Sequence, residues 1–340
     1  MKLRVVALLC GVVALVAAAA YWWGTQSGFA GAPAHAATAT SSAVVAKACG
    51  PAGSDSTHPG MVWVSGGTFM MGSEFAYREE GPSVSETVSG FWMDQTEVTN
   101  TQFAQFVAAT GHRTLAERGV RVTADANAPT VAGSAVFQPQ DAGATVRGLE
   151  HWWHFVPGAD WRHPRGPGSS VQQLSNHPVV HIAFEDAAAY AKWKGHSLPT
   201  EAQFEYAAQG SARKDAAGHF AANTWQGSFP ARNDSLDGYV GTAPVACFNA
   251  SALGLYDLIG NVWEWTASPY YETHDFAARA QYPQGLDPKQ PGEAVAVLKG
   301  GSYLCSPDYC MRYRPEARLG QSKGLGTSHI GFRTVLNSSQ

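Results

Sequence analysis

Three long stretches of this chain carry neither the apolar spacing of a helix nor that of a strand, and they limit what it can fold into. They cover residues 112–180, 211–255 and 268–296. Loops of this length inside a compact domain usually carry function or need a bound ion to hold them. The 36 glycines permit irregular backbone, and the 11 tryptophans supply large packing surfaces. The pattern therefore predicts a compact, loop-rich domain held together by aromatic packing.

The regular elements that remain are short. Apolar residues at 61–64 and 68–72, separated by Ser65-Gly66-Gly67, predict a hairpin, and a further strand is predicted over 87–93. Three helices are predicted, each ended by a glycine: Thr99 to Gly111, Glu185 to Gly195 and Thr200 to Gly210. The first and third begin with capping boxes, Thr99 with Gln102 and Thr200 with Gln203. With no internal repeat, the chain is predicted to form one mixed α/β domain over residues 61–338.

The first 36 residues have the composition of an export signal. Lys2 and Arg4 precede an apolar run that reaches about Ala20, and Ala34-His35-Ala36 is typical of a cleavage site. Cleavage would give a periplasmic or secreted protein. Retention would leave an N-terminal membrane anchor, because the run through Trp23 approaches the length of a span. We therefore expect a signal peptide or anchor over residues 1–36, a flexible linker over 37–60, and an exported folded part.

Composition excludes some classes of function. Hydrophobic residues make up 45% and charged residues 15% of the chain, so it is expected to bury a core over most of its length. The net charge is −4, and no block rich in Lys and Arg occurs. Nucleic acid is therefore not expected as a partner.

The segment from Lys299 to Arg314 carries the most chemistry. It places Cys305 and Cys310 on either side of a Ser-Pro-Asp turn and beside Arg312, so the two thiols can meet. Nearby cations favour the thiolate, the form that binds metal or attacks a substrate. Two thiolates without further ligands suit Cu(I), whereas zinc takes four ligands. A disulfide hairpin is the structural alternative, although so short a loop contributes only about 2 kcal/mol.

The remaining cysteines of the mature part are left undecided. Cys49 and Cys247 could pair, or Cys247 could be a plain buried thiol in a strand-like run.

Oxygen-bearing side chains flank two irregular stretches. Asn223 and Asp237 flank one loop, and Asp257 and Glu264 flank the next turn. Ca²⁺ takes hard oxygen ligands from irregular backbone of this kind. Solvated turn carboxylates are the structural alternative.

Histidines are numerous, but their spacing does not predict a metal centre. His177 and His181 are four residues apart, yet a proline lies between them and no Glu occupies the zinc-protease position. The other candidates, His151, His154 and His163, lie beside Trp or Pro, and no 2-His-carboxylate spacing is evident. A structural role is expected for each.

Nine motifs occur in order between residue 61 and about residue 335. They are Met70-Met71-Gly72, Asp94 to Asn100, Asp160 to Pro164, His177 to His181, Leu198 to Ala202, Asn223 to Gly227, Gly260 to Trp265, Lys299 to Arg314 and Thr327 to Arg333. This set resembles the formylglycine-generating enzymes, or sulfatase-modifying factors. The resemblance implies a mixed α/β fold with low regular secondary structure, related to C-type lectins. Most of the motifs mark the wider superfamily, whereas the Cys305-x4-Cys310 pair is specific, because relatives with other functions lack it.

The resemblance also implies a reaction. Members convert a cysteine in a Cys-x-Pro-x-Arg motif of an unfolded sulfatase polypeptide to formylglycine with O2, and Cys305 and Cys310 match the two thiols that bind Cu(I). Residues that match the lining of this pocket are Ser302, Trp263, Tyr309 and Arg312. The structural alternatives are core packing for Trp263 and loop bracing for Tyr309 and Arg312.

Two structural calcium ions are implied as further cofactors. The first would take Asn223, Asp237 and the carbonyls of Thr224 and Tyr239. The second would take Asp257, Glu264 and the carbonyls of Gly260 and Val262. Asp257 stands where some relatives have Asn, which keeps the ligand oxygen.

Two other functions on the same fold are the alternatives. One is a non-catalytic binding or maturation module, against which the retained thiol pair speaks. The other is a non-haem iron oxygenase, for which the histidine spacing gives little support.

Overall fold

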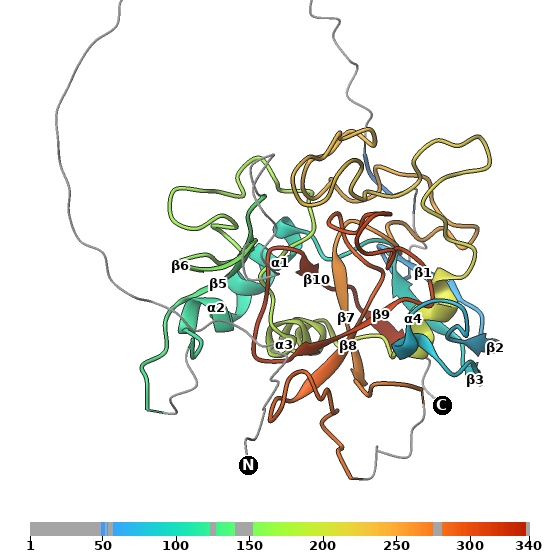
Figure 1. The fold of residues 1–340 in the computed structure, drawn as a ribbon, viewed down its shortest axis with the longest axis horizontal. Coiled ribbons are helices and arrows are strands. Elements are labelled where there is room, and N and C mark those ends of the chain that lie inside the picture. The colour runs from blue at the N-terminus through green and yellow to red at the C-terminus, as the bar shows by residue number, and fades with distance from the viewer. Residues whose placement is uncertain are drawn as a thin grey trace, which may run out of the picture.

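The computed structural model describes residues 49–51, 53, 57–122, 127–139, 152–274 and 281–337. In this part of the chain, short strands and helices are joined by long loops around a small central sheet (Figure 1). The predicted mixed α/β class is confirmed. The predicted signal peptide or anchor, and most of the predicted linker, lie outside the described residues.

The central sheet has the strand order β10-β7-β8-β9. Its strands are β7 (Trp263–Pro269), β8 (Val295–Lys299), β9 (Arg318–Ser322) and β10 (Ile330–Gly331). β10 runs parallel to β7, and the other neighbours are antiparallel. All five residues of β8 are buried, as expected for a continuous apolar strand covered on both faces.

The smaller sheets correct the predicted hairpin. β1 (Met61–Val64) pairs with β4 (Phe91–Asp94), which also pairs with β11 (Val335–Asn337), whereas β2 (Gly67–Met71) pairs with β3 (Val84–Val88). The hairpin prediction was therefore wrong about partners, because periodicity identifies strands but not what they pair with. The strand predicted over 87–93 is two strands, separated at Gly90, where a Cβ would lie 2.3 Å from the Trp63 ring.

The predicted helices form with the predicted caps. α1 (Asn100–Thr110), α3 (Phe184–Lys194) and α4 (Glu201–Ala208) match them, and the Thr99 and Thr200 capping boxes are both present. Gly111 and Gly195 adopt left-handed backbone at the helix ends. α4 stops at Ala208, two residues before the predicted Gly210.

The stretch 112–180 contains more regular structure than its pattern predicts. α2 (Leu115–Arg118) begins with a Thr114–Glu117 capping box, and β5 (Gly133–Phe137) pairs with β6 (Trp153–Pro157). Elements of four or five residues are too short to establish a period. Residues 211–255, all of them described, contain no helix or strand, as predicted.

Of four clusters of buried side chains, two are large and form most of the core. The larger joins α1 and α3 to the central sheet through Phe103, Tyr190, Trp265 and Leu298, and it includes Cys305. The second lies between α4 and the strands β1 to β4.

A disulfide links Cys49 to Cys247 across 198 residues of sequence, which settles the question left open by the sequence. It attaches the middle of the predicted linker, at Cys49, to the long loop before β7. None of the helices in the described residues has the length and apolar character needed to cross a bilayer.

Candidate active site

The thiol loop, which we define as residues 300–314, leaves the end of β8 and turns back on itself. Gly300 and Gly301 have φ of 91° and 79°, in the left-handed region that favours glycine. A Cβ on Gly301 would lie 2.3 Å from the carbonyl oxygen of Arg312, so this glycine lets the two arms of the loop approach. The backbone at Gly301 and at Arg312, on either side of the two cysteines, is thereby brought together.

Cys305 and Cys310 face each other within this loop. Their sulfur atoms are 3.3 Å apart and both are free thiols, since a disulfide would require about 2.05 Å. Cys305 is buried in the main core, and Cys310 is partly exposed. The Cys310 N–H donates to the Ser306 carbonyl at 2.8 Å, which confirms a tight turn between the thiols.

The two thiols are electrostatically unequal. The hydrogen bond that they share raises the pKa of Cys305, and burial raises it further. The same bond lowers the pKa of Cys310 to about 6, and the charge of Arg312 contributes in the same direction. Arg312 Nη1 lies 3.8 Å from the Cys310 sulfur. The pair is thus predisposed to hold one negative charge, mainly on Cys310.

Of the other predicted pocket residues, Ser302 and Trp263 pack with Cys305, whereas the Tyr309 ring packs against other aromatic rings. Ser302 is buried, and its carbonyl accepts the Cys305 N–H at 2.9 Å. Trp263 is buried in the same core cluster as Cys305. Tyr309 is half exposed and stacks on Phe229 at 4.4 Å between ring centroids. The catalytic roles of these three residues stay predictions.

One part of the site has no clear signal in the sequence. Tyr77 and the short helix η1 (Arg78–Glu80) contact the thiol loop, with Glu79 paired to Arg312. These two residues are 233 positions apart. The only local signal is a pair of acidic residues before Gly81-Pro82, which by itself predicts nothing.

In the first predicted oxygen set, Asp237 contacts the backbone of Thr224 and Tyr239, whereas the Asn223 amide bonds Gly241 and Asn261. Asp237 accepts hydrogen bonds from the Thr224 N–H at 2.9 Å, the Tyr239 N–H at 3.0 Å and the Gln226 amide at 2.6 Å. The same Gln226 amide donates to the Thr224 carbonyl, so a donor lies between two oxygens predicted to bind one ion. Asn223 Oδ1 is buried without a hydrogen-bond partner in the described residues. Burial raises the pKa of Asp237. The donor set fits a cation at this position.

The second set is buried and carries excess negative charge. Burial raises the pKa of Glu264, the pKa of Asp257 to about 6, and that of a third carboxyl, Glu97, well above its usual value. Arg333 holds Glu264 through contacts of 2.8 Å to 3.0 Å. One arginine thus faces three carboxyl groups, which fits a further cation. Glu97 was not predicted to belong here.

The carbonyl donors of the second set lie on a backbone that joins both sets. Gly260 has a φ of 79°, and a Cβ there would lie 2.4 Å from the Asn223 carbonyl. Val262 is fully buried. In the described residues, no group of three or more His, Cys, Asp or Glu side chains has metal-binding geometry by itself. Backbone and amide oxygens would therefore have to complete both calcium sets.

Three of the candidate histidines have protein partners. His181 is buried and its Nε2 lies 2.8 Å from the Pro164 carbonyl, and His177 Nδ1 lies 2.9 Å from the Thr242 hydroxyl. His163 pairs with Asp160. His154 lies in β6, and His151 lies outside the described residues.

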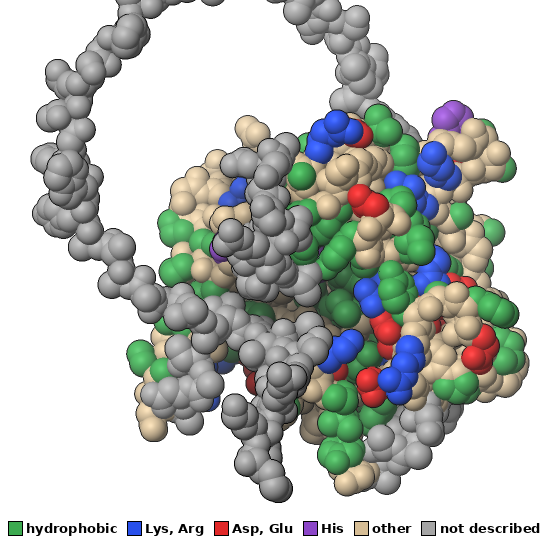
Figure 2. All heavy atoms as spheres, viewed as in Figure 1, with side chains coloured by type: hydrophobic (Ala, Val, Ile, Leu, Met, Phe, Trp, Pro, Cys, Tyr) green, Lys and Arg blue, Asp and Glu red, His purple; other side chains and the backbone are tan. Residues whose placement is uncertain are grey.

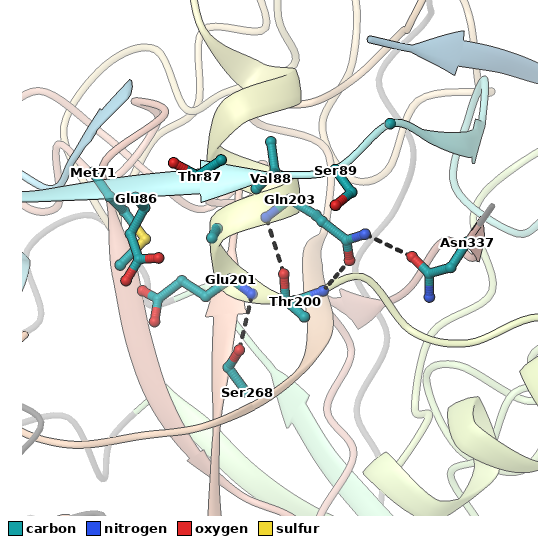
Figure 3. Close-up of a pocket in the computed structure, with 12 residues that line it drawn as sticks. Met71, Glu86, Thr87, Val88, Ser89, Thr200, Glu201, Gln203, Ser268 and Asn337 are labelled. Carbon is teal, nitrogen blue, oxygen red and sulfur yellow. Dashed lines mark hydrogen bonds between the residues drawn. The ribbon is translucent and has the colours of Figure 1, made fainter. Parts of the chain in front are cut away.

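A separate pocket of about 540 Å³ lies at the start of α4 and does not include either thiol. Figure 3 shows its polar wall, where the Gln203 side chain reaches Thr200 and Asn337. On the face drawn in Figure 2, Lys and Arg side chains lie among Asp and Glu side chains.

The site and the fold describe a loop-rich mixed α/β protein that carries a pair of free thiols. Comparison with known proteins identifies the family. Residues 46–338 match the family described as the sulfatase-modifying factor enzyme 1-like domain. The chain is 45% identical to a protein of Mycobacterium tuberculosis named formylglycine-generating enzyme, over 81% of this chain and 97% of that protein. It is 35% identical to a mouse protein named inactive Cα-formylglycine-generating enzyme 2, over 83% and 87% of the two chains.

The chain therefore belongs to the sulfatase-modifying factor enzyme 1-like family, and the resemblance seen in the sequence is confirmed. The solved structure of PvdO from Pseudomonas aeruginosa has a TM-score of 0.51 at 21% identity and covers 81% of this chain and 93% of its own. That likeness shows a shared fold.

Proposed function

We propose that this protein oxidises a cysteine in a Cys-x-Pro-x-Arg segment of an unfolded sulfatase to formylglycine, with Cu(I) and O2 at Cys305 and Cys310. The single observation that carries the proposal is the free thiol pair, 3.3 Å apart beside Arg312. The names of its relatives, which include both active and inactive members, support the reaction class.

The residues present fit a soft monovalent metal ion. Cys305 and Cys310 offer two sulfur donors, one already favouring the thiolate, and soft sulfur ligands select Cu(I) over harder ions. When bound, the ion would supply a soft centre for the substrate sulfur and the electron transfer that O2 chemistry needs. Arg312 would hold negative charge on Cys310, and the hydroxyls of Ser302 and Tyr309 would orient polar species. Trp263 would exclude water from the part of the pocket next to Cys305.

The overall reaction balances with a thiol reductant. The substrate side chain –CH2–SH, O2, two electrons and two protons give –CHO, hydrogen sulfide and water. Two reductant thiols supply the electrons as they form a disulfide. The carbon–sulfur bond and one carbon–hydrogen bond of the substrate break.

The test is mass spectrometry of a Cys-x-Pro-x-Arg peptide incubated with the protein, copper, O2 and a thiol reductant. We expect a loss of about 18 Da on the cysteine, from the change of –CH2–SH to –CHO at a metal–oxygen site. A peptide with Ser in place of Cys is the control. An unchanged peptide under all copper and reductant conditions would favour a binding or maturation module.

We also propose that the oxygen sets hold structural Ca²⁺. The support for the first is the orphaned Asn223 oxygen, next in sequence to Thr224, whose N–H donates to Asp237, with the Tyr239 carbonyl expected to complete the set. The support for the second is the excess charge at Asp257 and Glu264, with Gly260 and Val262 supplying carbonyls.

Export to the periplasm or the exterior is proposed from Lys2, Arg4 and Ala34-His35-Ala36. N-terminal sequencing of protein from its native host should return a start near Ala37. A start at Met1 would instead indicate an anchored form.

A further inference from the structure

A brace, which we define as residues 77–80, contacts the thiol loop and the strand that follows it. It precedes β3 in the sequence, far from the thiols, and no predicted role involves it. Its contacts are Met311 N–H to the Tyr77 hydroxyl at 3.2 Å, Arg312 to Glu79, Arg314 to Glu80 at 2.6 Å, and Arg318 to the Glu79 carbonyl at 2.8 Å.

Arg312 is held on three sides by this arrangement. Its Nη2 donates to the Glu79 carboxylate, and its Nη1 lies 3.8 Å from the Cys310 sulfur. Its guanidinium carbon lies 3.9 Å from the ring centroid of Tyr77. The side chains of Arg312 and Glu79 are 21% and 17% exposed, so solvent screens this ion pair only in part.

A free arginine side chain would not stay beside one sulfur atom. Its rotamer entropy is about 2 kcal/mol, and a thiolate contact at 3.8 Å is too weak to fix it alone. The Glu79 carboxylate is a charge-assisted acceptor, and the Tyr77 face adds a cation–π contact. Both contacts are made to the same guanidinium group that reaches Cys310.

We propose that Glu79 is a positioning residue that holds the Arg312 guanidinium beside Cys310, with the Tyr77 ring supporting it. The inference rests on the proposed function only for what the activated sulfur does. The geometry by which Glu79 acts through Arg312 is independent of the reaction.

Two effects of Glu79 oppose each other at Cys310. Its negative charge by itself disfavours a second negative charge nearby, whereas its hydrogen bond keeps the closer positive charge of Arg312 in place. The positioning effect dominates, because Arg312 lies between Glu79 and the sulfur. The two neighbouring arginines have their own carboxylate partners, since Arg314 pairs with Glu80 and Arg318 with Glu201.

The test measures the rate at which Cys310 is alkylated in reduced, metal-free protein at one neutral pH, with the modified site located by mass spectrometry. Glu79→Ala should slow alkylation about three- to tenfold, the scale expected when one cation leaves a thiolate. Glu79→Gln keeps an acceptor for Arg312 and should stay within about twofold of wild type. Tyr77→Leu, which leaves the carboxylate in place, should slow alkylation in the same direction.

A double-mutant cycle separates positioning from a general structural effect. Arg312→Ala should slow alkylation as Glu79→Ala does, and the double variant should be no slower than Arg312→Ala alone. Glu272→Ala is the matched control. It removes the exposed ion pair between Glu272 and Arg78, and Arg78 lies in the same short helix as Glu79. It should leave the rate unchanged.

Three results would overturn the proposal: an unchanged or faster rate in Glu79→Ala, a failure of Glu79→Gln to rescue it, or multiplying effects in the double variant. If the wild type converts no peptide, the proposed reaction fails, yet the alkylation cycle still decides whether Glu79 acts through Arg312.

Discussion

The thiol loop and the two oxygen sets differ in how far protein groups already pair with their charged atoms. In the oxygen sets, protein donors already occupy much of the ligand space, since the Gln226 amide bridges Asp237 and Thr224, and Arg333 holds Glu264. In the thiol loop, the sulfur atoms contact each other, and the Arg312 guanidinium donates to the Cys310 sulfur. Several oxygens of the first arrangement therefore already have protein partners, whereas the second leaves a reactive group open to an external partner.

The largest expected effect comes from changing the soft donors. Cys310→Ser should abolish Cu(I) retention and peptide turnover while changing the free energy of unfolding by less than about 1 kcal/mol, because a hydroxyl is a poor ligand for a soft ion. Copper retention is measured against a competing Cu(I) chelator in the presence of a thiol reductant. Cys305→Ser should lose copper retention and turnover in the same way, with a larger loss of stability of about 1–3 kcal/mol, because it places a hydroxyl in the main core.

Equal copper retention by the wild type and Cys310→Ser would show that the thiols do not hold the copper. The thiol loop would then be structural, and the binding-module alternative would lead.

The disulfide gives the second largest effect, and it acts on stability. Replacing both Cys49 and Cys247 by Ser removes a link across 198 residues, so we expect a loss of roughly 2–5 kcal/mol in urea unfolding. Ala246, next to Cys247, donates its N–H to Asp257 at 2.7 Å, so the second oxygen set should loosen with it. Wild type with the disulfide reduced serves as the control and should match the variant. Coincident unfolding curves for oxidised wild type and variant would contradict the prediction.

Calcium removal should produce a smaller loss of stability. An ion bound to the folded state stabilises it by mass action, so a calcium chelator should lower the Tm by several degrees, in line with about 2–3 kcal/mol. Alkylation of Cys310 should change little, because the ions would act on the other region. Asp237→Asn should reduce the effect of the chelator. An unchanged Tm, together with no calcium by elemental analysis, would make Asp237 and Glu264 ordinary buried carboxyl groups.

The features that the sequence could predict are those formed by residues close together in the chain. The capping boxes at Thr99 and Thr200 are local, and so is the turn that brings Cys305 to Cys310, so short-range patterns predict both. The resemblance supplied the family and the ligand sets. It could not reveal that Gln226 fills the space between two ligand oxygens.

Long-range partners could not be read from a single sequence. The pairing of β1 with β4, the Cys49–Cys247 bond and the contact of Glu79 with Arg312 each join residues whose neighbourhood is fixed only by the whole fold. No period or spacing encodes such contacts, because loop closure lets distant segments meet at little extra entropic cost. The electrostatics of the site depends on these contacts.

The smallest expected effect tests the excess charge of the second oxygen set. Folding raises the pKa of Asp257 to about 6 through burial, above its ordinary value of 3.8. An acid whose pKa is raised on folding makes the folded state bind more protons, so chelated protein should lose stability as the pH rises from about 4 to 6. Asp257→Asn cannot ionise and should be more stable than wild type at pH 7 by roughly 1–3 kcal/mol, with the gain vanishing near pH 4. With calcium present, the stability advantage of Asp257→Asn over wild type should shrink or reverse, because the neutral amide is the poorer ligand.

Urea unfolding at about pH 5 and pH 7.5, with and without chelator, measures this difference, and Asp234→Asn is an exposed control. A gain at pH 7 that is the same with and without calcium would mean that Asp257 holds no ion, and the first oxygen set would then be the only one left to compare with the thiol loop.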